Sequence, residues 1–133
     1  LGLAEIVGDT GKVIGADLQQ QMLDIMLKRA GKKGLAHRII PHRTSPTAIG
    51  ITTPLDFVLA FWMIHEVPDP AAFFKEIAAI LKHSAKLLYA EPSFHVSERK
   101  YKEILADADD AGLDVCKSLV IGFSRAALLE KKT

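Results

Sequence analysis

The clearest pattern along the chain is an apolar run of strand length that ends in aromatic residues and is followed by a proline-marked helix start. The run begins just after Asp56 and continues to Phe61 and Trp62, and Asp69 and Pro70 follow a few residues later. This pattern predicts a strand, a loop at its carboxyl end and then a helix. Because ligands of an open α/β sheet bind outside the carboxyl ends of its strands, the loop 61–66 is the first candidate site.

The residues before this stretch read as a short strand, an acid and an amphipathic helix. The strand covers 12–17 and ends in Asp17, and apolar residues at helical spacing run from Leu18 to Ala30, with Gly31 placed to cap the helix. Residues 1–7 have apolar positions at helical spacing but are too few for an independent helix. A short edge strand at 37–40 and a polar loop at 41–53 complete this part.

The residues after the central stretch continue the alternation. The pattern predicts, in order, a helix capped by Asp69, a strand at 86–90, a helix from Ser97 to Gly112, and strands at 113–120 and 124–129. Alternating strands and helices predict a doubly wound, mostly parallel α/β sheet, and the last two strands predict an antiparallel hairpin at its end.

Composition narrows the class of protein. A chain of 133 residues, 49% hydrophobic and 25% charged, is expected to form a single domain over 1–133. The net charge of +1 argues against nucleic-acid binding. The one cysteine, Cys116, is expected in the core and indicates a reducing, cytoplasmic setting. The sequence contains no apolar run of about 18 residues, so it predicts no membrane span.

The stretch from Asp56 to Pro70 resembles the fourth-strand region of class I S-adenosylmethionine (SAM)-dependent methyltransferases, and the resemblance extends over nearly the whole chain. It implies a Rossmann-like fold, SAM as the cofactor and a small-molecule methyl acceptor. The closing hairpin agrees with it, because that hairpin separates a methyltransferase-like sheet from an ordinary dinucleotide-binding fold.

The resemblance also implies roles for individual residues. Asp17 stands where the family's acid binds both ribose hydroxyls of SAM, a match of two donors to two carboxylate oxygens. Leu18 and Met22 follow it and would contact the adenine ring. The family's acid for the adenine amine is missing; Thr44 stands at about that position and could substitute through its hydroxyl or a backbone carbonyl. Two further residues, Phe61 and Trp62, could line the cofactor site, where an aromatic face attracts the sulfonium through a cation–π interaction, or could simply pack in the core.

Three residues near the strand ends carry acid–base chemistry. His65 and Glu66 are the plausible acid–base pair, and His65 is the candidate catalytic base, although packing is the alternative. The sequence His65-Glu66 matches the first two residues of the zinc-protease motif His-Glu-x-x-His. The second histidine is missing, and Pro68 would break the helix that the motif requires, so no metal is expected. Glu91 is read as solvated rather than as facing an acceptor pocket.

The start of the chain departs from the family pattern. Residues 1–8 resemble the back end of the helix that follows the family's first strand and glycine-rich loop, so the domain is expected to be truncated at its N-terminus. Loss of this central strand would leave uncovered edges that invite pairing with a second copy. The alternative function is a non-catalytic remnant that serves only folding or association. A nicotinamide-dependent reductase is disfavoured, because Gly-x-Gly-x-x-Gly and Tyr-x-x-x-Lys are both absent.

Overall fold

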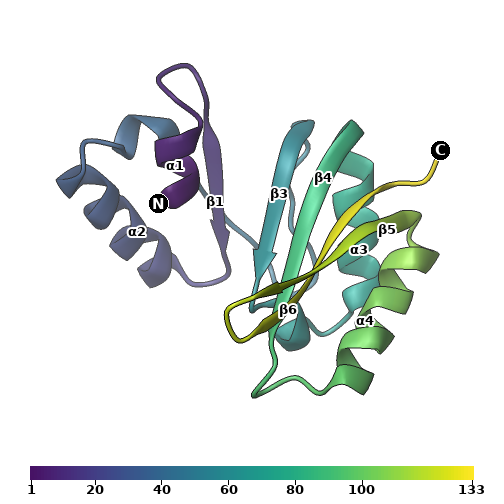
Figure 1. Ribbon diagram of the computed structural model, residues 1–133. Coiled ribbons are helices and arrows are strands. Elements are labelled where there is room, and N and C mark those ends of the chain that lie inside the picture. The colour runs from purple at the N-terminus through teal and green to yellow at the C-terminus, as the bar shows by residue number, and fades with distance from the viewer. The chain divides into compact units, whose positions relative to one another are not determined.

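The computed structural model describes all 133 residues, which form two compact units, 1–50 and 51–133, each with its own sheet (Figure 1). The first unit holds α1 (Gly2–Ile6), β1 (Val13–Asp17), α2 (Gln20–Lys32), a 3₁₀ turn (Ala36–Arg38) and β2 (Ile39–Arg43). The second holds β3 (Leu55–Phe61), a 3₁₀ turn (Ile64–Glu66), α3 (Pro70–Ile80), β4 (Leu81–Pro92), α4 (Glu98–Asp110), β5 (Leu113–Ile121) and β6 (Ser124–Lys131). No helix among these is long and apolar enough to cross a membrane.

The first unit is a parallel strand pair with helices packed on it. β1 and β2 pair in register from Val13 with Ile39 to Asp17 with Arg43. The small core comprises Ala4, Ala30, Leu35 and Ile39. Residues 1–7, expected to be too few for an independent helix, form α1 with support from the rest of the unit, because Ala4 is buried in this core and the Arg38 guanidinium donates a hydrogen bond to the Ala4 carbonyl at 3.0 Å.

The end of α2 differs from the sequence prediction. Gly31 lies inside the helix, which continues to Lys32, and the residue in the left-handed region is Gly34, with φ of +68°. Glycine is favoured there because a side chain would clash with the backbone. The predicted edge strand at 37–40 begins later, at Ile39, after the 3₁₀ turn.

The second unit is a four-stranded sheet in the order β3-β4-β6-β5, in which β3 and β4 are parallel and the other pairs antiparallel. Figure 1 shows α3 and α4 side by side along this sheet. The predicted caps are present: Asp69 accepts a hydrogen bond from Ala72 N at 3.0 Å, and Ser97 accepts one from Lys100 N at 3.1 Å. The predicted C-terminal hairpin is β5 with β6.

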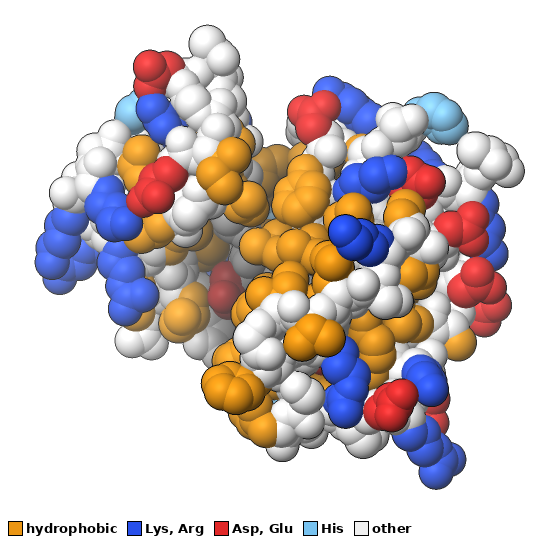
Figure 2. Space-filling view, in the orientation of Figure 1, with side chains coloured by type: hydrophobic (Ala, Val, Ile, Leu, Met, Phe, Trp, Pro, Cys, Tyr) orange, Lys and Arg blue, Asp and Glu red, His pale blue; other side chains and the backbone are white.

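The face of this sheet that carries Phe57, Leu59 and Phe61 of β3 keeps much apolar surface exposed, about two fifths of each side chain. These residues alternate along the strand, as side chains on one face must. Figure 2 shows hydrophobic side chains gathered over β3 and over the β5–β6 hairpin of this unit. Exposed apolar surface of this kind is typical of a binding surface.

Two strand predictions need correction. β4 starts at Leu81 rather than at residue 86, because Leu81 already pairs with Leu55 of β3; the register then shifts so that Phe57 pairs with Lys86, and residues 82–85, where Ser84 has φ of +66°, are passed over. Cys116 is exposed rather than in the core. It falls between Val115 and Lys117, where the register of β5 against β6 shifts, so the alternation of buried and exposed positions is broken there.

Candidate functional site

In the first unit, the carboxyl end of β1 presents the carboxylate of Asp17. Its Oδ1 accepts a hydrogen bond from the backbone N–H of Gln19 at 2.8 Å, while Oδ2 has no partner within the chain. The Asp17 carbonyl accepts a hydrogen bond from Thr44 N at 3.0 Å, which ties the end of β1 to the loop after β2. Asp17 is therefore fixed through one oxygen and keeps the other for a ligand.

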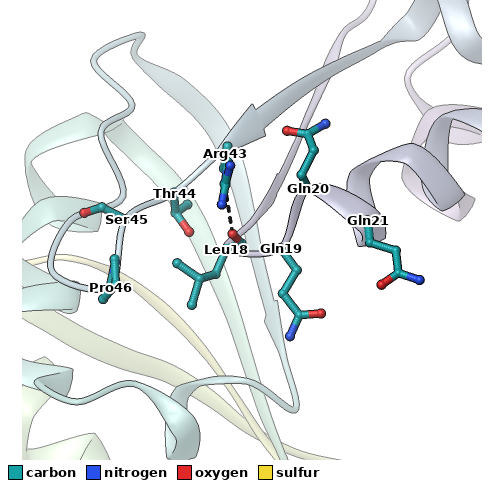
Figure 3. Close-up of a pocket in the computed structure, with 8 residues that line it drawn as sticks. All are labelled: Leu18, Gln19, Gln20, Gln21, Arg43, Thr44, Ser45 and Pro46. Carbon is teal, nitrogen blue, oxygen red and sulfur yellow. Dashed lines mark hydrogen bonds between the residues drawn. The ribbon is translucent and has the colours of Figure 1, made fainter.

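An open pocket of about 770 Å³ lies at this strand end. Figure 3 shows Arg43 reaching the carbonyl of Leu18, to which its Nε donates a hydrogen bond at 3.2 Å. The lining residues are Leu18, Gln19, Gln20, Gln21, Arg43, Thr44, Ser45 and Pro46. The pocket thus brings together two of the residues that the sequence indicated, Leu18 and Thr44, directly beside Asp17.

Other lining residues were missed from the sequence. The glutamines 19–21 and Arg43 carried no motif, although their place next to a strand-ending acid and at the start of α2 was a usable signal. Met22 does not line the pocket, and its side chain is 46% exposed on α2. Its predicted contact with an adenine ring stays a prediction.

These residues fit an adenosine group. The unpartnered Asp17 Oδ2 suits a hydroxyl donor, and Leu18 offers apolar surface for a flat base. Thr44 offers a hydroxyl in the place where the family pattern has a carboxylate. The residues that could hold a nucleoside cofactor are therefore present in this unit.

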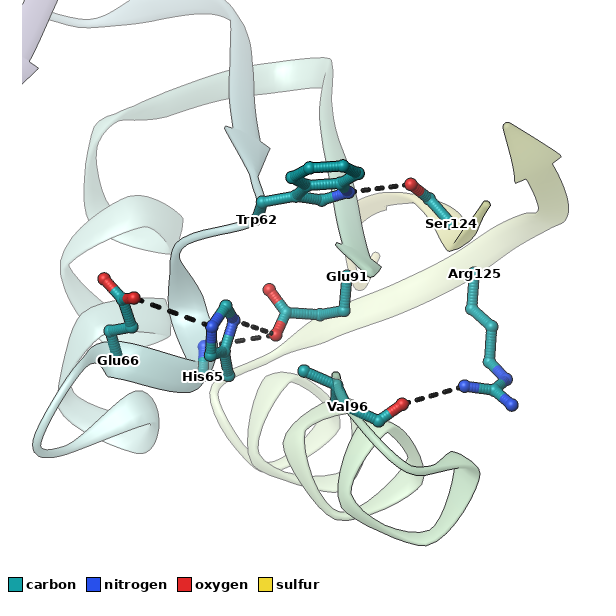
Figure 4. Close-up of polar contacts among 7 residues, drawn as sticks. All are labelled: Trp62, His65, Glu66, Glu91, Val96, Ser124 and Arg125. Carbon is teal, nitrogen blue, oxygen red and sulfur yellow. Dashed lines mark hydrogen bonds and ion pairs between the residues drawn. The ribbon is translucent and has the colours of Figure 1, made fainter. Parts of the chain in front are cut away.

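In the second unit, Trp62 follows β3 in a conformation that is unusual for a large side chain. Its φ is +59°, which costs of order 1–3 kcal/mol in a non-glycine residue. Two hydrogen bonds hold it: Trp62 N donates to the Ala90 carbonyl at 2.8 Å, and Nε1 donates to Ser124 Oγ at 2.7 Å (Figure 4). The neighbouring structure thus fixes this indole in place.

Two phenylalanines lie against this indole. The Phe61 ring stacks on it, with centroids 5.3 Å apart and planes 20° apart, and the Phe94 ring meets it edge-on at 5.6 Å and 86°. All three side chains remain exposed, by 42% for Phe61, 41% for Trp62 and 73% for Phe94. We call these three residues the aromatic ledge.

The 3₁₀ turn after β3 places His65 against Glu91, the last acid of β4 (Figure 4). Glu91 Oε2 lies 2.7 Å from His65 Nδ1 and 3.2 Å from His65 N. When Glu91 is ionised its oxygens can only accept hydrogen bonds, so in that state Nδ1 carries the ring proton and Nε2 is the basic nitrogen. Nε2 lies 3.8 Å from Glu66 Oε1, beyond a good hydrogen bond.

The prediction that Glu91 is solvated is wrong, since it is 1% exposed and its Oε1 is buried without a partner. Burial raises the pKa of Glu91 above its ordinary value of 4.5, although the charge and hydrogen bonds of His65 oppose the shift. Burial also raises the pKa of Tyr89, whose hydroxyl likewise has no partner, and the Glu91 charge adds to that rise. The sequence placed both acidic and basic residues near strand ends but did not show that they pair.

The described residues contain no group of three or more His, Cys, Asp or Glu side chains that could hold a metal ion.

Comparison with known proteins places this geometry in a family. Residues 2–89 match the family described as the methyltransferase domain. Demethylmenaquinone methyltransferase of Anoxybacillus flavithermus is 27% identical over 93 residues, which are 70% of this chain and 39% of that protein. The Lactobacillus johnsonii protein of the same name is 32% identical over 94 residues, which are 70% of this chain and 38% of that protein. This chain thus spans about two fifths of the length of the curated relatives it matches.

A solved structure supports the fold. The crystal structure of a SAM-dependent methyltransferase from Aquifex aeolicus aligns with a TM-score of 0.79 at 23% identity, covering 96% of this chain and 73% of that one. The predicted Rossmann-like α/β fold is therefore confirmed, and SAM is the cofactor that this family uses. The chain belongs to the methyltransferase domain family, and it shares its fold with a SAM-dependent methyltransferase.

Proposed function

We propose that this chain supplies the SAM-binding part of a methyltransferase that acts on a small-molecule acceptor. The observation that carries the proposal is the Asp17 carboxylate at the end of β1, fixed through Oδ1 and unpartnered at Oδ2, beside an open pocket. A strand-ending acid next to a pocket is the arrangement that ribose hydroxyls require.

Residues of the first unit would bind the nucleoside. Asp17 accepts the ribose hydroxyls, Leu18 and Met22 contact the adenine ring, and Thr44 offers its hydroxyl to the adenine amine. SAM, when bound, supplies a methyl group activated by its sulfonium. The prediction that Phe61 and Trp62 wall the cofactor is independent of these roles and needs a separate test.

Residues of the second unit would serve the acceptor. His65 is the proposed base, because an ionised Glu91 accepts the proton-bearing Nδ1 and leaves Nε2 as the nitrogen that can take a proton. A base of this kind is needed when the acceptor atom carries a proton that it must lose, as a hydroxyl does. The curated relatives are named for demethylmenaquinone, a quinone, which supports a quinone in its reduced, hydroxylated form as the first acceptor to test.

Calorimetric titration with S-adenosylhomocysteine tests the cofactor site. Asp17→Ala should weaken binding about 10- to 100-fold, because charge-assisted hydrogen bonds of roughly 1.5–3 kcal/mol are lost. Asp24→Ala is the matched control, since Asp24 is an exposed acid of α2 that accepts a hydrogen bond from Gln20 Nε2 at 3.0 Å, and it should leave the affinity unchanged. Equal affinities for the wild type and Asp17→Ala would exclude Asp17 from the site.

Transfer of a labelled methyl group from SAM to reduced demethylmenaquinone tests the acceptor. Activity that is lost in His65→Gln but retained in His37→Gln, an exposed histidine of the other unit, supports the assigned base. If S-adenosylhomocysteine binds but no label is transferred, the acceptor assignment is wrong. The solution mass under the same conditions tests the expectation that a second copy pairs with this chain.

A further inference from the structure

The aromatic ledge gathers three exposed rings at one end of the second unit's sheet. Phe61 and Trp62 are nearly parallel, and Phe94 is nearly perpendicular to Trp62, so the rings form two walls at about a right angle. Other rings of this unit, such as Phe74 and Tyr89, are fully buried. The ledge therefore keeps ring surface in solvent where the fold elsewhere uses rings to fill its core.

Two side-chain donors beside the ledge already have acceptors. The indole N–H of Trp62 donates to Ser124, and the Arg125 guanidinium donates to the Val96 carbonyl at 2.9 Å. Glu91 is engaged with His65 (Figure 4). A ligand on the ledge would consequently meet ring faces and edges rather than free donors, which favours a neutral, planar, aromatic group.

The ledge is also fixed before any ligand arrives. Trp62 is held in its left-handed backbone conformation by hydrogen bonds at both its backbone nitrogen and its indole nitrogen. Because its ring is already ordered, a ligand that stacks on it loses little binding energy to ordering the protein. The conformation is an outlier for so large a residue, and such outliers concentrate at functional sites.

We propose that the aromatic ledge binds the planar ring system of an aromatic methyl acceptor, of the fused-ring phenol or quinol class. This deepens the proposed function and rests on it for the identity of the ligand as the acceptor. The competing assignment is that Phe61 and Trp62 wall the cofactor, and the experiment below separates the two.

Trp62 is the only tryptophan in the chain, so 5-fluorotryptophan labelling gives a single ¹⁹F resonance that reports on the ledge. The probe is 2-naphthol, a neutral fused-ring phenol. The matched control is decahydro-2-naphthol, which has the same carbon skeleton and hydroxyl but is not planar. We expect a saturable shift with 2-naphthol and a much smaller one with the saturated alcohol.

Variants locate the binding on the ledge. Phe94→Leu, which keeps apolar volume but removes the ring, should weaken 2-naphthol binding about tenfold. Phe123→Leu is the control, since Phe123 is a 78% exposed phenylalanine that is not part of the ledge, and it should leave the affinity unchanged. Thermal unfolding of each variant confirms that it is folded, and both positions are exposed enough for the fold to tolerate the change.

Three results would overturn the proposal. These are no shift with 2-naphthol, equal shifts with both alcohols, and a shift with S-adenosylhomocysteine that competes with 2-naphthol, which would assign the ledge to the cofactor. Because the titrations with the two alcohols need no cofactor, their failure is distinguishable from failure of the proposed function. Loss of S-adenosylhomocysteine binding at Asp17 leaves the ¹⁹F result standing, and the reverse also holds.

Discussion

Glu91 and His65 are joined twice, because one carboxyl oxygen of Glu91 shares a hydrogen bond of 2.7 Å with the ring Nδ1 of His65 and accepts another of 3.2 Å from its backbone N–H. The glutamate is buried and its second oxygen has no partner. The pair therefore fixes the orientation of the imidazole, while the glutamate remains in surroundings that disfavour its charge.

The first prediction concerns the pH dependence of stability. The pKa of Glu91 is raised above 4.5 in the folded chain, so the folded state retains its proton over a range in which the unfolded state has lost it. The contribution of Glu91 to the free energy of unfolding is therefore full below about pH 4.5 and falls as the pH rises through the raised pKa. Urea unfolding of the wild type and Glu91→Gln should show their difference in stability falling with pH.

The variant His65→Gln tests whether the raised pKa of Glu91 causes this pH dependence of stability. Since His65 lowers the pKa of Glu91, His65→Gln should raise it further and extend the fall in stability to higher pH. The groups that face this pair include Tyr89, Tyr101 and Glu66, which all remain in both variants. If the difference in the free energy of unfolding between the wild type and Glu91→Gln stays constant across this pH range, Glu91 has no raised pKa.

The second prediction concerns the two glycines at the end of α2. Gly34→Ala should destabilise the chain by about 1 kcal/mol, because alanine disfavours the φ of +68° found there. Gly31→Ala should stabilise it by about 0.5–1 kcal/mol, because Gly31 lies within the helix and a Cβ there meets nothing within 4 Å. Thermal or urea unfolding gives both values, and a shift of the same sign for both variants contradicts the assigned end of the helix.

The third prediction concerns the cap of α3. Asp69→Ala removes the carboxylate that accepts from Ala72 N and should cost about 1 kcal/mol of stability. Asp56→Ala removes another exposed acid, whose contact is a surface ion pair with Lys82, and should cost less than about 0.5 kcal/mol. Equal losses in urea unfolding would mean that the cap contributes no more than a surface charge.

The fourth prediction concerns the anchor of the aromatic ledge. Ser124→Ala leaves the indole N–H of Trp62 without an acceptor and should cost about 1–3 kcal/mol, because Ser124 is buried and the hydrogen bond is partly shielded from water. The Trp62 fluorescence spectrum should change with it. Ser118→Ala on the exposed side of β5 is the control, and an equal effect of the two substitutions counts against the anchor.

Local chemistry explains what the sequence could predict. Asp69 and Ser97 cap helices by accepting from backbone N–H groups only three residues away, and the acid of Asp17 lies directly at a strand end, so each signal is contained in a few neighbouring positions. The succession of strands and helices along the chain and the C-terminal hairpin follow in the same way from periodicity and turn residues. These features could be predicted because no distant contact competes with them.

Contacts between distant positions explain the rest. Glu91 and His65 are 26 positions apart, and Trp62 and Ser124 are 62 apart, so no window of sequence contains either pair. Cys116 was placed in the core by an alternation that the shifted register of β5 interrupts. The roles of the indicated residues toward SAM likewise depend on a ligand and stay predictions.

The division into two units has a consequence for how the chain opens in solution. Residues 1–50 close a two-stranded sheet over a small core, whereas residues 51–133 close four strands, and a unit as small as the first is marginal by itself. Amide protons of β1 and β2 should therefore exchange with solvent before those of β4 and β6. Local unfolding of the first unit would then disrupt and re-form the strand end at Asp17 many times while the indole of Trp62 stays in place. The residues proposed to bind the cofactor and the aromatic ledge would therefore fluctuate on different timescales.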